Sequence, residues 1–265
     1  MSTPPDPSSA RPFGSRFAAS AEAGKRDRPV IAIDGPAGAG KSTLAAHLAR
    51  RFGFLNLETG AMYRALALKA IENDLDFDEE APLLTLASQT NIALEPHRDG
   101  NRVLLDKQDV SRRVRDPDVT AAASRISIHP QLRAWMVAQQ RALGLAGGVV
   151  MEGRDIGTAV FPDAEVKIFL DAAPEVRGSR RFQQNSIAPI TAAPPDALTA
   201  AAILRDLQER DSRDRNRVDS PLRPAVDANV IDSTSLTLTE VIDRAEELVR
   251  AHLAPDPARH TLPPT

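Results

Sequence analysis

The sequence predicts an α/β fold in which helices flank both faces of a five-stranded parallel sheet. Short apolar runs alternate along the chain with segments of helical periodicity, and five of them are strand candidates: residues 30–33, 54–57, 149–151, 166–170 and 230–231. Unbroken apolar runs of this length are typical of parallel strands buried on both faces. Polar clusters follow four of the runs, at residues 34–43, 58–64, 152–157 and 232–234. Because ligands of such sheets bind beyond the carboxyl ends of the strands, we expect one edge of the sheet to carry the chemistry.

Whole-chain composition excludes several classes of protein. The chain has 265 residues, 42% of them hydrophobic, which suits one α/β domain with a small insert. It has no cysteine, so a disulfide framework and a thiolate metal site are excluded. A formal charge of −3 argues against a general binder of nucleic acid or anionic membranes. No apolar run approaches the ~18 residues of a membrane span, and the N-terminus lacks the apolar core of a signal peptide, so we expect a cytoplasmic protein.

Both ends of the chain have the composition of disordered segments. Residues 1–28 mix Pro, Ser, Ala and Gly with charges and show no sustained period, which predicts a disordered extension. A transit peptide is the alternative interpretation, but Pro4, Pro5 and Pro7 would interrupt an amphipathic helix. Residues 254–265 are expected to form a loose tail.

A phosphate-binding loop follows the first strand. After Val30-Ile31-Ala32-Ile33-Asp34 the chain reads Gly35-Pro36-Ala37-Gly38-Ala39-Gly40-Lys41-Ser42-Thr43, which satisfies the spacing GxxxxGK[ST]. Glycines let backbone N–H groups turn toward phosphate oxygens, and the following helix adds its positive end. Lys41 can reach the β- and γ-phosphates, and the Ser42 hydroxyl can ligate the accompanying Mg²⁺. A glycine-rich turn that matches by chance is the alternative. Strand and helix flank this one as the motif requires, so we predict a P-loop NTPase core in which residues 35–43 bind the phosphates of a nucleoside triphosphate.

The first half of the chain continues with helices and one small β unit. Leu44, Leu48 and Phe52 recur at helical spacing and Gly53 can cap the end, which predicts a helix over about 41–52. Further helices are expected from residue 59 to about 73, and over about 78–90, 116–127 and 130–144. Between them, residues 91–115 contain two apolar runs separated by Asp99-Gly100-Asn101, which predicts an antiparallel insert.

The second half holds the most charged segment. Residues 174–181 and 204–217 have helical patterns rich in Arg, Asp and Glu, separated by a Pro/Ala-rich linker at 185–199, and a final helix is expected over about 237–253. A solvated helix with ion pairs four residues apart is one interpretation of such a charge run. However, Arg210, Asp214 and Arg217 are spaced i, i+4 and i+7 on one helix face, where cations can converge on a phosphate. The five histidines have no ligand spacing, and we predict no metal site from them.

Several sequence blocks together resemble the bacterial cytidylate kinase family of nucleoside monophosphate kinases. They are IDGPAGAGKST at 33–43, TGAMYRALA at 59–67, EGRDIGTAVFPDAEVKIFLDA at 152–172, RDSRDRNR at 210–217 and IDSTSLT at 231–237. The phosphate loop occurs in proteins of many activities, whereas the blocks at 152–172 and 210–217 resemble little outside this family. The resemblance, which covers about residues 30–249, implies transfer of phosphate from ATP·Mg²⁺ to CMP or dCMP. It also implies a kinase domain at 29–253, with a monophosphate-binding lobe that includes the insert at about 59–127 and a mobile lid at about 174–217.

The resemblance also implies the residues that bind each substrate. Thr59, Arg64, Arg154 and Arg217 would hold the CMP phosphate; Ser124, Arg133 and Asp155 would face the cytosine; Arg210 and Asp214 would lie near the sugar. An alternative role for Asp155 is to order its loop by pairing with an arginine. On the ATP side, the lid arginines Arg177, Arg180 and Arg181 would cover the phosphates, and Ser233 and Thr234 would lie by the adenine. The residues expected to act in catalysis are Lys41, Arg154, Arg177, Arg181 and Arg217.

Two positions depart from the family pattern. Glu58 stands where the family usually has Asp, which lengthens the side chain by one methylene. Residues 185–199 form a Pro/Ala-rich lid segment where the family usually has a charged helix. Of the properties that the resemblance implies, lid closure is therefore the one with the least support in the sequence.

Two other functions fit the same phosphate loop. The first is a kinase for another small acceptor, such as shikimate or a different nucleotide. The second is a regulatory NTPase switch or motor, which hydrolyses ATP without an acceptor, whereas a kinase is nearly idle until one is added. We expect a monomer that binds ATP and CMP or dCMP, with neither nucleic acid nor membrane as a partner.

Overall fold

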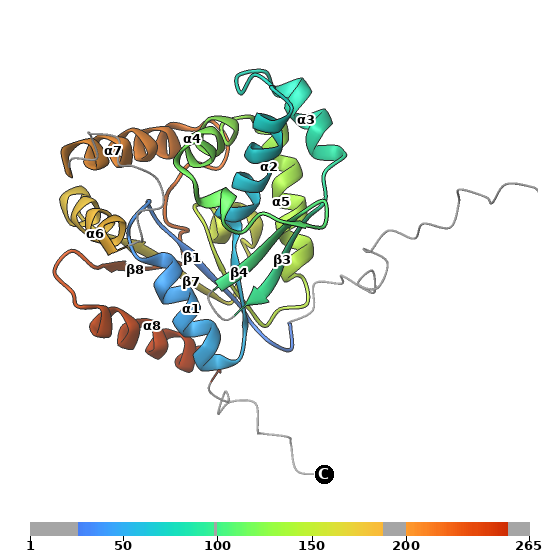
Figure 1. The fold of residues 1–265 in the computed structure, drawn as a ribbon. Helices are drawn as coiled ribbons and strands as arrows, with labels where there is room; N and C mark the ends of the chain where they lie inside the picture. Colours follow the sequence, from blue (N-terminus) through green and yellow to red (C-terminus); the bar gives the residue numbers. More distant parts are fainter. Residues whose placement is uncertain (1–25, 98–99, 188–199, 254–265) are drawn as a thin grey trace, which may run out of the picture.

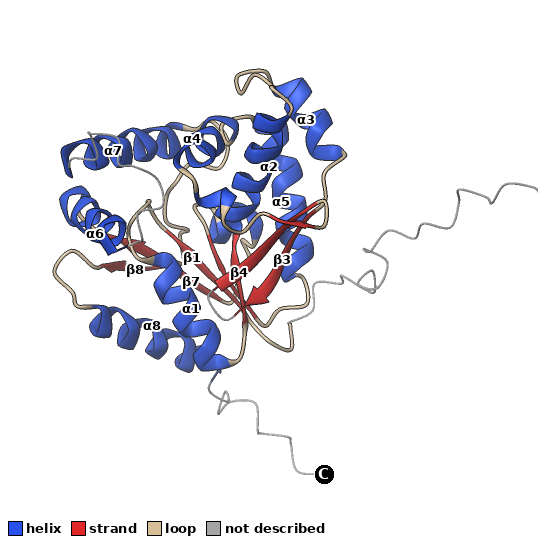
Figure 2. Ribbon diagram, in the orientation of Figure 1, coloured by secondary structure: helices blue, strands red, loops and turns tan. Residues whose placement is uncertain are grey.

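The computed structural model describes residues 26–97, 100–187 and 200–253 (Figure 1). Its main sheet has five parallel strands in the order β2-β6-β1-β7-β8 (Figure 2). They are β1 (Val30–Asp34), β2 (Leu55–Glu58), β6 (Val149–Glu152), β7 (Val166–Asp171) and β8 (Asn229–Asp232). The predicted five-stranded parallel sheet is therefore confirmed. The order could not be predicted, and it places β1 in the centre, so the residues that follow β1 lie between those that follow β6 and β7.

Each face of the sheet has its own helical layer. Side chains alternate along β1: Val30 and Ala32 join the core on one face, and Ile31 and Ile33 join the core on the other. The first core is completed by α2 (Thr59–Glu72), α4 (Pro117–Ile126) and α5 (Pro130–Gly144), and the second by α1 (Lys41–Phe52) and α8 (Leu238–Leu253). This double burial explains why the strands are continuous apolar runs.

Local sequence signals account for the helix ends. Gly53 adopts φ 66° and its N–H bonds to the carbonyl of Ala49, which ends α1. Pro117 and Pro130 occupy the first positions of α4 and α5, where a missing N–H costs nothing. The helix expected over 78–90 is shorter in the structure, where α3 spans Glu80–Ser88.

The expected insert is a small antiparallel sheet beside β2. Its strands are β3 (Ile92–His97), β4 (Gly100–Leu105) and β5 (Gln108–Asp109), followed by the 3₁₀ turn η3 (Arg113–Arg115). The sheet joins the body of the protein through buried apolar side chains that include Leu94, Val103 and Leu105. The antiparallel insert is therefore confirmed.

Two helices lie over the carboxyl ends of β7 and β8. These are α6 (Pro174–Ile187) and α7 (Ala200–Asn216), which run side by side at the upper left of Figure 1. The helix α7 starts earlier than expected and ends at Asn216, so Arg217 follows the helix instead of belonging to it. Residues 188–199, which hold most of the Pro/Ala-rich linker, lie outside the described residues.

The described part of the chain begins with contacts to the core. Arg26 pairs with Asp163 at 2.5 Å and with Glu165 at 3.0 Å. Arg28 lies over the ring of Phe54 at 4.8 Å. Residues 26–28, although we expect them to belong to the extension, therefore contact the domain. Residues 1–25 and the tail expected at 254–265 lie outside the described residues.

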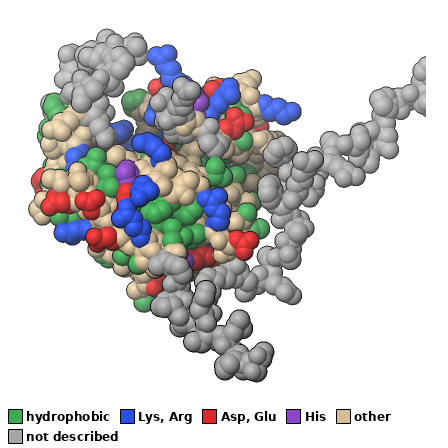
Figure 3. Space-filling model, turned by 90° about the horizontal axis from the view of Figure 1, so that it is seen from below, with side chains coloured by type: hydrophobic (Ala, Val, Ile, Leu, Met, Phe, Trp, Pro, Cys, Tyr) green, Lys and Arg blue, Asp and Glu red, His purple; other side chains and the backbone are tan. Residues whose placement is uncertain are grey.

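The molecular surface shows no segregation of charge on the face seen in Figure 3, where Lys and Arg side chains are interspersed with Asp and Glu. Within residues 26–97, 100–187 and 200–253, no helix is long and apolar enough to cross a membrane.

Candidate active site

The phosphate loop has the backbone geometry that its motif requires. Gly38 and Gly40 adopt φ 78° and 101°, a region that favours glycine. At Gly35, with φ 146°, an added Cβ would lie 2.0 Å from the carbonyl oxygen of Leu170, so no larger residue fits. The helix α1 begins at Lys41, immediately after the loop. Backbone N–H groups and the positive end of α1 therefore converge beyond the end of β1, where an anion is stabilised.

Lys41 is buried at the base of this loop. Its Nζ donates to the carbonyl oxygen of Pro36 at 2.8 Å, which folds the side chain back over the loop. Burial and the nearby charge of Arg154 lower the pKa of Lys41 to about 7, against the opposing effects of Glu152 and Asp34. Lys41 is thus only partly protonated near neutral pH, and an arriving anion would favour its charged form.

Asp34 ties the phosphate-loop strand to the segment that follows β6. Its two carboxylate oxygens accept hydrogen bonds from the backbone N–H groups of Ile156 and Gly157, both at 2.7 Å. Burial raises the pKa of Asp34 to about 6, although these two bonds act in the opposite direction. The π-helical turn η4 (Ile156–Val160) is thereby fixed against β1.

Glu152 provides a carboxylate beside the phosphate loop. It ends β6, opposite Ile33 of β1, and is buried with no hydrogen-bond partner for Oε1. Burial and the charge of Glu58 raise its pKa, while a hydrogen bond with the Ser42 side chain lowers it. The Ser42 hydroxyl and the Glu152 carboxylate form a pair of oxygen donors, which is the ligand chemistry that Mg²⁺ prefers.

Sequence reasoning missed Glu152, because only the strand order shows that β6 lies next to β1.

No group of three or more His, Cys, Asp and Glu within the described ranges could hold a metal ion. Ser42 and Glu152 supply two oxygen donors, so an octahedral Mg²⁺ bound there would take its other ligands from elsewhere.

Two arginines contact Asp214 near Lys41. Arg154 donates from Nε to Asp214 at 2.9 Å, and Arg217 lies 3.7 Å from the other carboxylate oxygen. Burial, and then the charge of Arg133, lower the pKa of Arg217, and its Nη2 is buried without a hydrogen-bond partner. Of the three residues expected to converge, Asp214 and Arg217 are thus in contact, whereas Arg210 pairs with Asp206 at 3.2 Å. The unpartnered Nη2 of Arg217 is a donor that suits an anion.

Another arginine, Arg64, lies in the first half of α2. Arg64 pairs with Glu58, and its Nε is buried without a partner. The Thr59 hydroxyl donates to the carbonyl oxygen of Glu152 at 2.7 Å, which links α2 to β6. Asn101 of the insert accepts from the Glu58 N–H at 3.1 Å and donates to the carbonyl of Asn56 at 2.7 Å. The insert thus supports the Glu58–Arg64 pair, a role that the sequence did not indicate.

The three residues expected at the cytosine come from three segments. Arg133 of α5 forms a buried ion pair with Asp155 and donates from Nη1 to the Ser127 carbonyl at 3.1 Å. Ser124 lies on α4, one turn before Ser127, whose hydroxyl donates to the Ser124 carbonyl. The guanidinium of Arg133 also lies 5.9 Å from the ring of Tyr63, a neighbour that sequence reasoning missed. The carboxylate of Asp155 is therefore already paired with an arginine, as the alternative interpretation expects.

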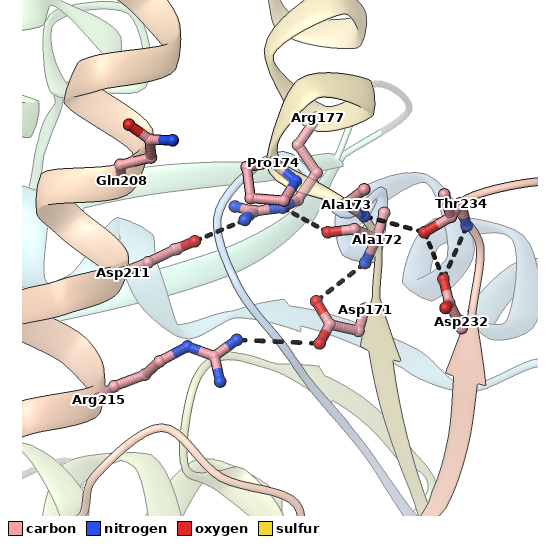
Figure 4. A pocket seen from close by; sticks show the side chains of 10 residues that line it. All are labelled: Asp171, Ala172, Ala173, Pro174, Arg177, Gln208, Asp211, Arg215, Asp232 and Thr234. Carbon is pink, nitrogen blue, oxygen red and sulfur yellow. Dashed lines mark hydrogen bonds and ion pairs between the residues drawn. The ribbon is translucent and has the colours of Figure 1, made fainter.

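The lid arginines differ in their surroundings. Arg177 is buried, donates to the carbonyl of Ala172 at 2.8 Å and pairs with Asp211 at 2.6 Å (Figure 4). It also donates to the carbonyl of Ala37 at 3.0 Å. Arg180 donates to the hydroxyl and the carbonyl of Ser233. Arg181 is exposed, and its charge contributes to lowering the pKa of Arg210, so these two side chains lie near each other.

A cavity of about 640 Å³ lies beside Arg177 (Figure 4). It is lined by the ends of β7 and β8, the start of α6, one side of α7 and Thr234. The hydroxyl oxygen of Thr234 accepts from the Ala173 N–H at 2.9 Å.

Comparison with known proteins agrees with the sequence resemblance. The family model described as Cytidylate kinase matches residues 31–251. A protein named cytidylate kinase from Vibrio cholerae is 43% identical over 85% of this chain and 97% of its own. One from Solibacter usitatus is 44% identical over 86% and 95%, and one from Pelotomaculum thermopropionicum 46% over 81% and 92%. Among solved structures, a gluconokinase from Sinorhizobium meliloti covers 86% of this chain and 96% of its own at 14% identity, with a TM-score of 0.45.

The match extends through every part of the site described above, from the phosphate loop to the residues that follow β8. Together with identities above 40% over almost the whole length of the relatives, it identifies the family. The chain belongs to the cytidylate kinase family.

Proposed function

We propose that this protein transfers the γ-phosphate of ATP to CMP and dCMP, giving ADP and CDP or dCDP. The observation that carries the proposal is the convergence of Lys41, in its phosphate loop, with the Arg154–Asp214–Arg217 cluster, because two anionic substrates must meet against their mutual repulsion. The names of the relatives supply the acceptor.

ATP would occupy the phosphate loop. Backbone N–H groups of residues 35–43 and the start of α1 would bind its β- and γ-phosphates, with Lys41 as the mobile cation. Ser233 and Thr234 would lie at the nucleoside end, where the cavity next to Thr234 provides room. Arg181, being exposed on α6, is free to approach the phosphates when the segment at about 174–217 acts as a lid.

Mg²⁺ would be held by Ser42 and Glu152 together with the phosphates. Oxygen donors at both positions, and the unpartnered Oε1 of Glu152, fit this ion. When bound, the ion would neutralise charge on the transferring phosphate.

CMP would lie between α2, α4, α5 and the end of α7, in the lobe at about 59–127. Its phosphate would be bound by the Thr59 hydroxyl and by arginines that have unused donors or shared partners: Arg64, Arg154 and Arg217. Arg210 and Asp214 would lie near the sugar, where Asp214 would keep its pair with Arg154 and accept a hydrogen bond from a sugar hydroxyl. Ser124, Arg133 and Asp155 would read the cytosine edge, since the Arg133–Asp155 pair combines fixed donors with an acceptor.

These residues act by position and charge. Phosphoryl transfer needs the acceptor oxygen, the γ-phosphate and the leaving oxygen in line, and it needs the charge on the transferring group neutralised. Lys41 and the arginines supply that charge in a buried site, where it is most effective. A lid that covers the phosphates would exclude water, which competes with CMP for the γ-phosphate.

All the proposed contacts come from one chain, so a monomer suffices, and the cytoplasm is where both nucleotides occur. The nearest rival is an NTPase switch, and acceptor dependence separates the two. We expect ADP release by the purified protein to be near background with ATP·Mg²⁺ alone and to rise at least ~10²-fold when CMP is added, the scale of a completed transition-state site. Hydrolysis that is equally fast without CMP would contradict the proposal.

A further inference from the structure

We infer that Asp211 is a positioning residue through which α7 couples the two nucleotide sites, so that binding of one nucleotide tightens binding of the other. The inference rests on the proposed function for the identity of the two ligands. It concerns a side chain outside the proposed CMP site, on the wall of the cavity beside Arg177.

On one side, Asp211 reaches the phosphate loop through Arg177. Asp211 and Arg177 form an ion pair of 2.6 Å (Figure 4). Arg177 also donates from Nη1 to the carbonyl of Ala37, inside the loop, at 3.0 Å. Arg177 is only 2% exposed. Its Cβ also lies close to the loop, since a Cβ added at Gly38 would lie 3.3 Å from it. The position of Asp211 is thus transmitted to the loop by a buried guanidinium, each of whose three nitrogens has a partner.

On the other side, the same helix reaches the proposed CMP phosphate site through Asp214. Its carboxylate bonds to Arg154 at 2.9 Å, and its backbone carbonyl accepts from Arg217 Nε at 3.3 Å. Asp211 and Asp214 are spaced i, i+3 and are neighbours on the surface of α7. Both are buried, at 8% and 9% exposed.

These two carboxylates make α7 a rigid link between the sites. A helix moves as a unit, so a shift or ordering of α7 at Asp214 also acts on Asp211. The Oδ1 atom of Asp211 has no hydrogen-bond partner, so this carboxylate depends on its pair with Arg177. The CMP phosphate would accept hydrogen bonds from Arg154 and Arg217 and thereby order α7. ATP would then bind to a phosphate loop that is already ordered. The expected coupling is therefore positive.

The test is a thermodynamic cycle by calorimetry on the full chain. The dissociation constant of CMP is measured with and without a saturating non-hydrolysable ATP analogue and Mg²⁺. For the unaltered protein we expect the analogue to tighten CMP binding at least ~5-fold, the lower end of usual coupling. In Asp211→Asn, which keeps the shape and removes the charge, that factor should fall below ~2-fold, while CMP binding alone changes less than ~2-fold because Asp211 does not touch CMP. Glu209→Gln is the matched control: it removes a carboxylate from an exposed position of the same helix and should retain the coupling.

Hydrogen exchange of the unaltered protein gives a second test that does not depend on any variant folding. CMP alone should slow amide exchange within the phosphate loop, residues 35–41, by a measurable factor. Unchanged coupling in Asp211→Asn, no coupling in the unaltered protein, or a phosphate loop indifferent to CMP would each overturn the inference. None of these results affects the proposed function, which fails separately if CMP neither binds nor is phosphorylated.

Discussion

The guanidinium of Arg133 and the carboxylate of Asp155 form a buried ion pair that joins α5 to the segment after β6. A pair of this kind presents donors and an acceptor in fixed positions, which suits the N4 amine, N3 and O2 of cytosine. Uracil has an acceptor at O4 and a proton on N3, so UMP would oppose like groups. Mispairing in a site built for hydrogen bonds costs on the order of 10²-fold in kcat/KM.

We therefore predict that Asp155→Asn narrows the CMP:UMP ratio of kcat/KM at least ~10-fold, because the amide offers a donor that suits O4. The KM for ATP should change little. The same variant also tests a purely structural role, since an unpaired buried Arg133 would be destabilising. A constant ratio combined with a collapse of thermal stability would mean that Asp155 only orders its loop.

The depressed pKa of Lys41 predicts a pH dependence of ATP binding. In the free protein this pKa is about 7, because of burial and then Arg154. A bound triphosphate raises it again, so binding above pH 7 takes up a proton. Affinity should then fall as pH rises above 7, approaching about tenfold per pH unit for one full proton.

Proton uptake can be measured by calorimetry in buffers of different ionisation enthalpy, with a non-hydrolysable ATP analogue. Lys41→Met serves as the control, because it keeps the titration of the nucleotide and removes that of the lysine. If both proteins take up the same number of protons at pH 8, Lys41 does not titrate in this range.

Glu152 is expected to set the requirement for Mg²⁺. Glu152→Gln keeps the size of the side chain and removes the charge beside Ser42, so the Mg²⁺ concentration for half-maximal activity should rise at least ~10-fold. Glu72→Gln, at an exposed position of α2, is the comparison variant and should leave the titration unchanged. An unaltered Mg²⁺ titration in Glu152→Gln would remove Glu152 from the metal site.

Arg217 is expected to act on CMP, in contrast to the other arginines of the same segment. It is buried beside Asp214 and has an unused donor, whereas Arg205 is exposed on α7. Arg217→Ala should raise the KM for CMP or lower kcat by at least ~10-fold, the scale of a lost charge-assisted hydrogen bond. Arg205→Ala should change either constant less than ~2-fold, as exposed ion pairs contribute little. Equal, small effects in steady-state assays of the two variants would indicate a solvated charged helix.

Local signals in the sequence were sufficient for the parts of the molecule that are continuous along the chain. Glycines at fixed spacing predicted the phosphate loop, and the apolar runs predicted all five strands. The predicted end of α7 was wrong by one residue, because Arg217 is as polar as the residues of the helix that precedes it.

Contacts between distant segments could not be predicted from the same signals. Glu152 became a candidate ligand only when β6 was found next to β1, and Asn101 reached Glu58 only because the insert lies beside β2. Arg177, which is expected to act on the ATP phosphates, donates in this structure to the carbonyls of Ala37 and Ala172, two contacts that the sequence did not indicate. The residues next to an arginine in the sequence do not indicate whether a carboxylate far along the chain will pair with it.

The most direct test of the proposed activity is the identity of the phosphorylated product. The purified protein is given ATP·Mg²⁺ with one acceptor at a time from CMP, dCMP, UMP, AMP, GMP and shikimate, and each new phosphorylated compound is identified by phosphorus NMR and mass spectrometry. We predict CDP and dCDP, with kcat/KM for UMP lower on the order of 10²-fold and no turnover of shikimate. Preferential phosphorylation of AMP, GMP or shikimate, or ADP release without any phosphorylated acceptor, would contradict the assignment of cytidine monophosphates as substrates.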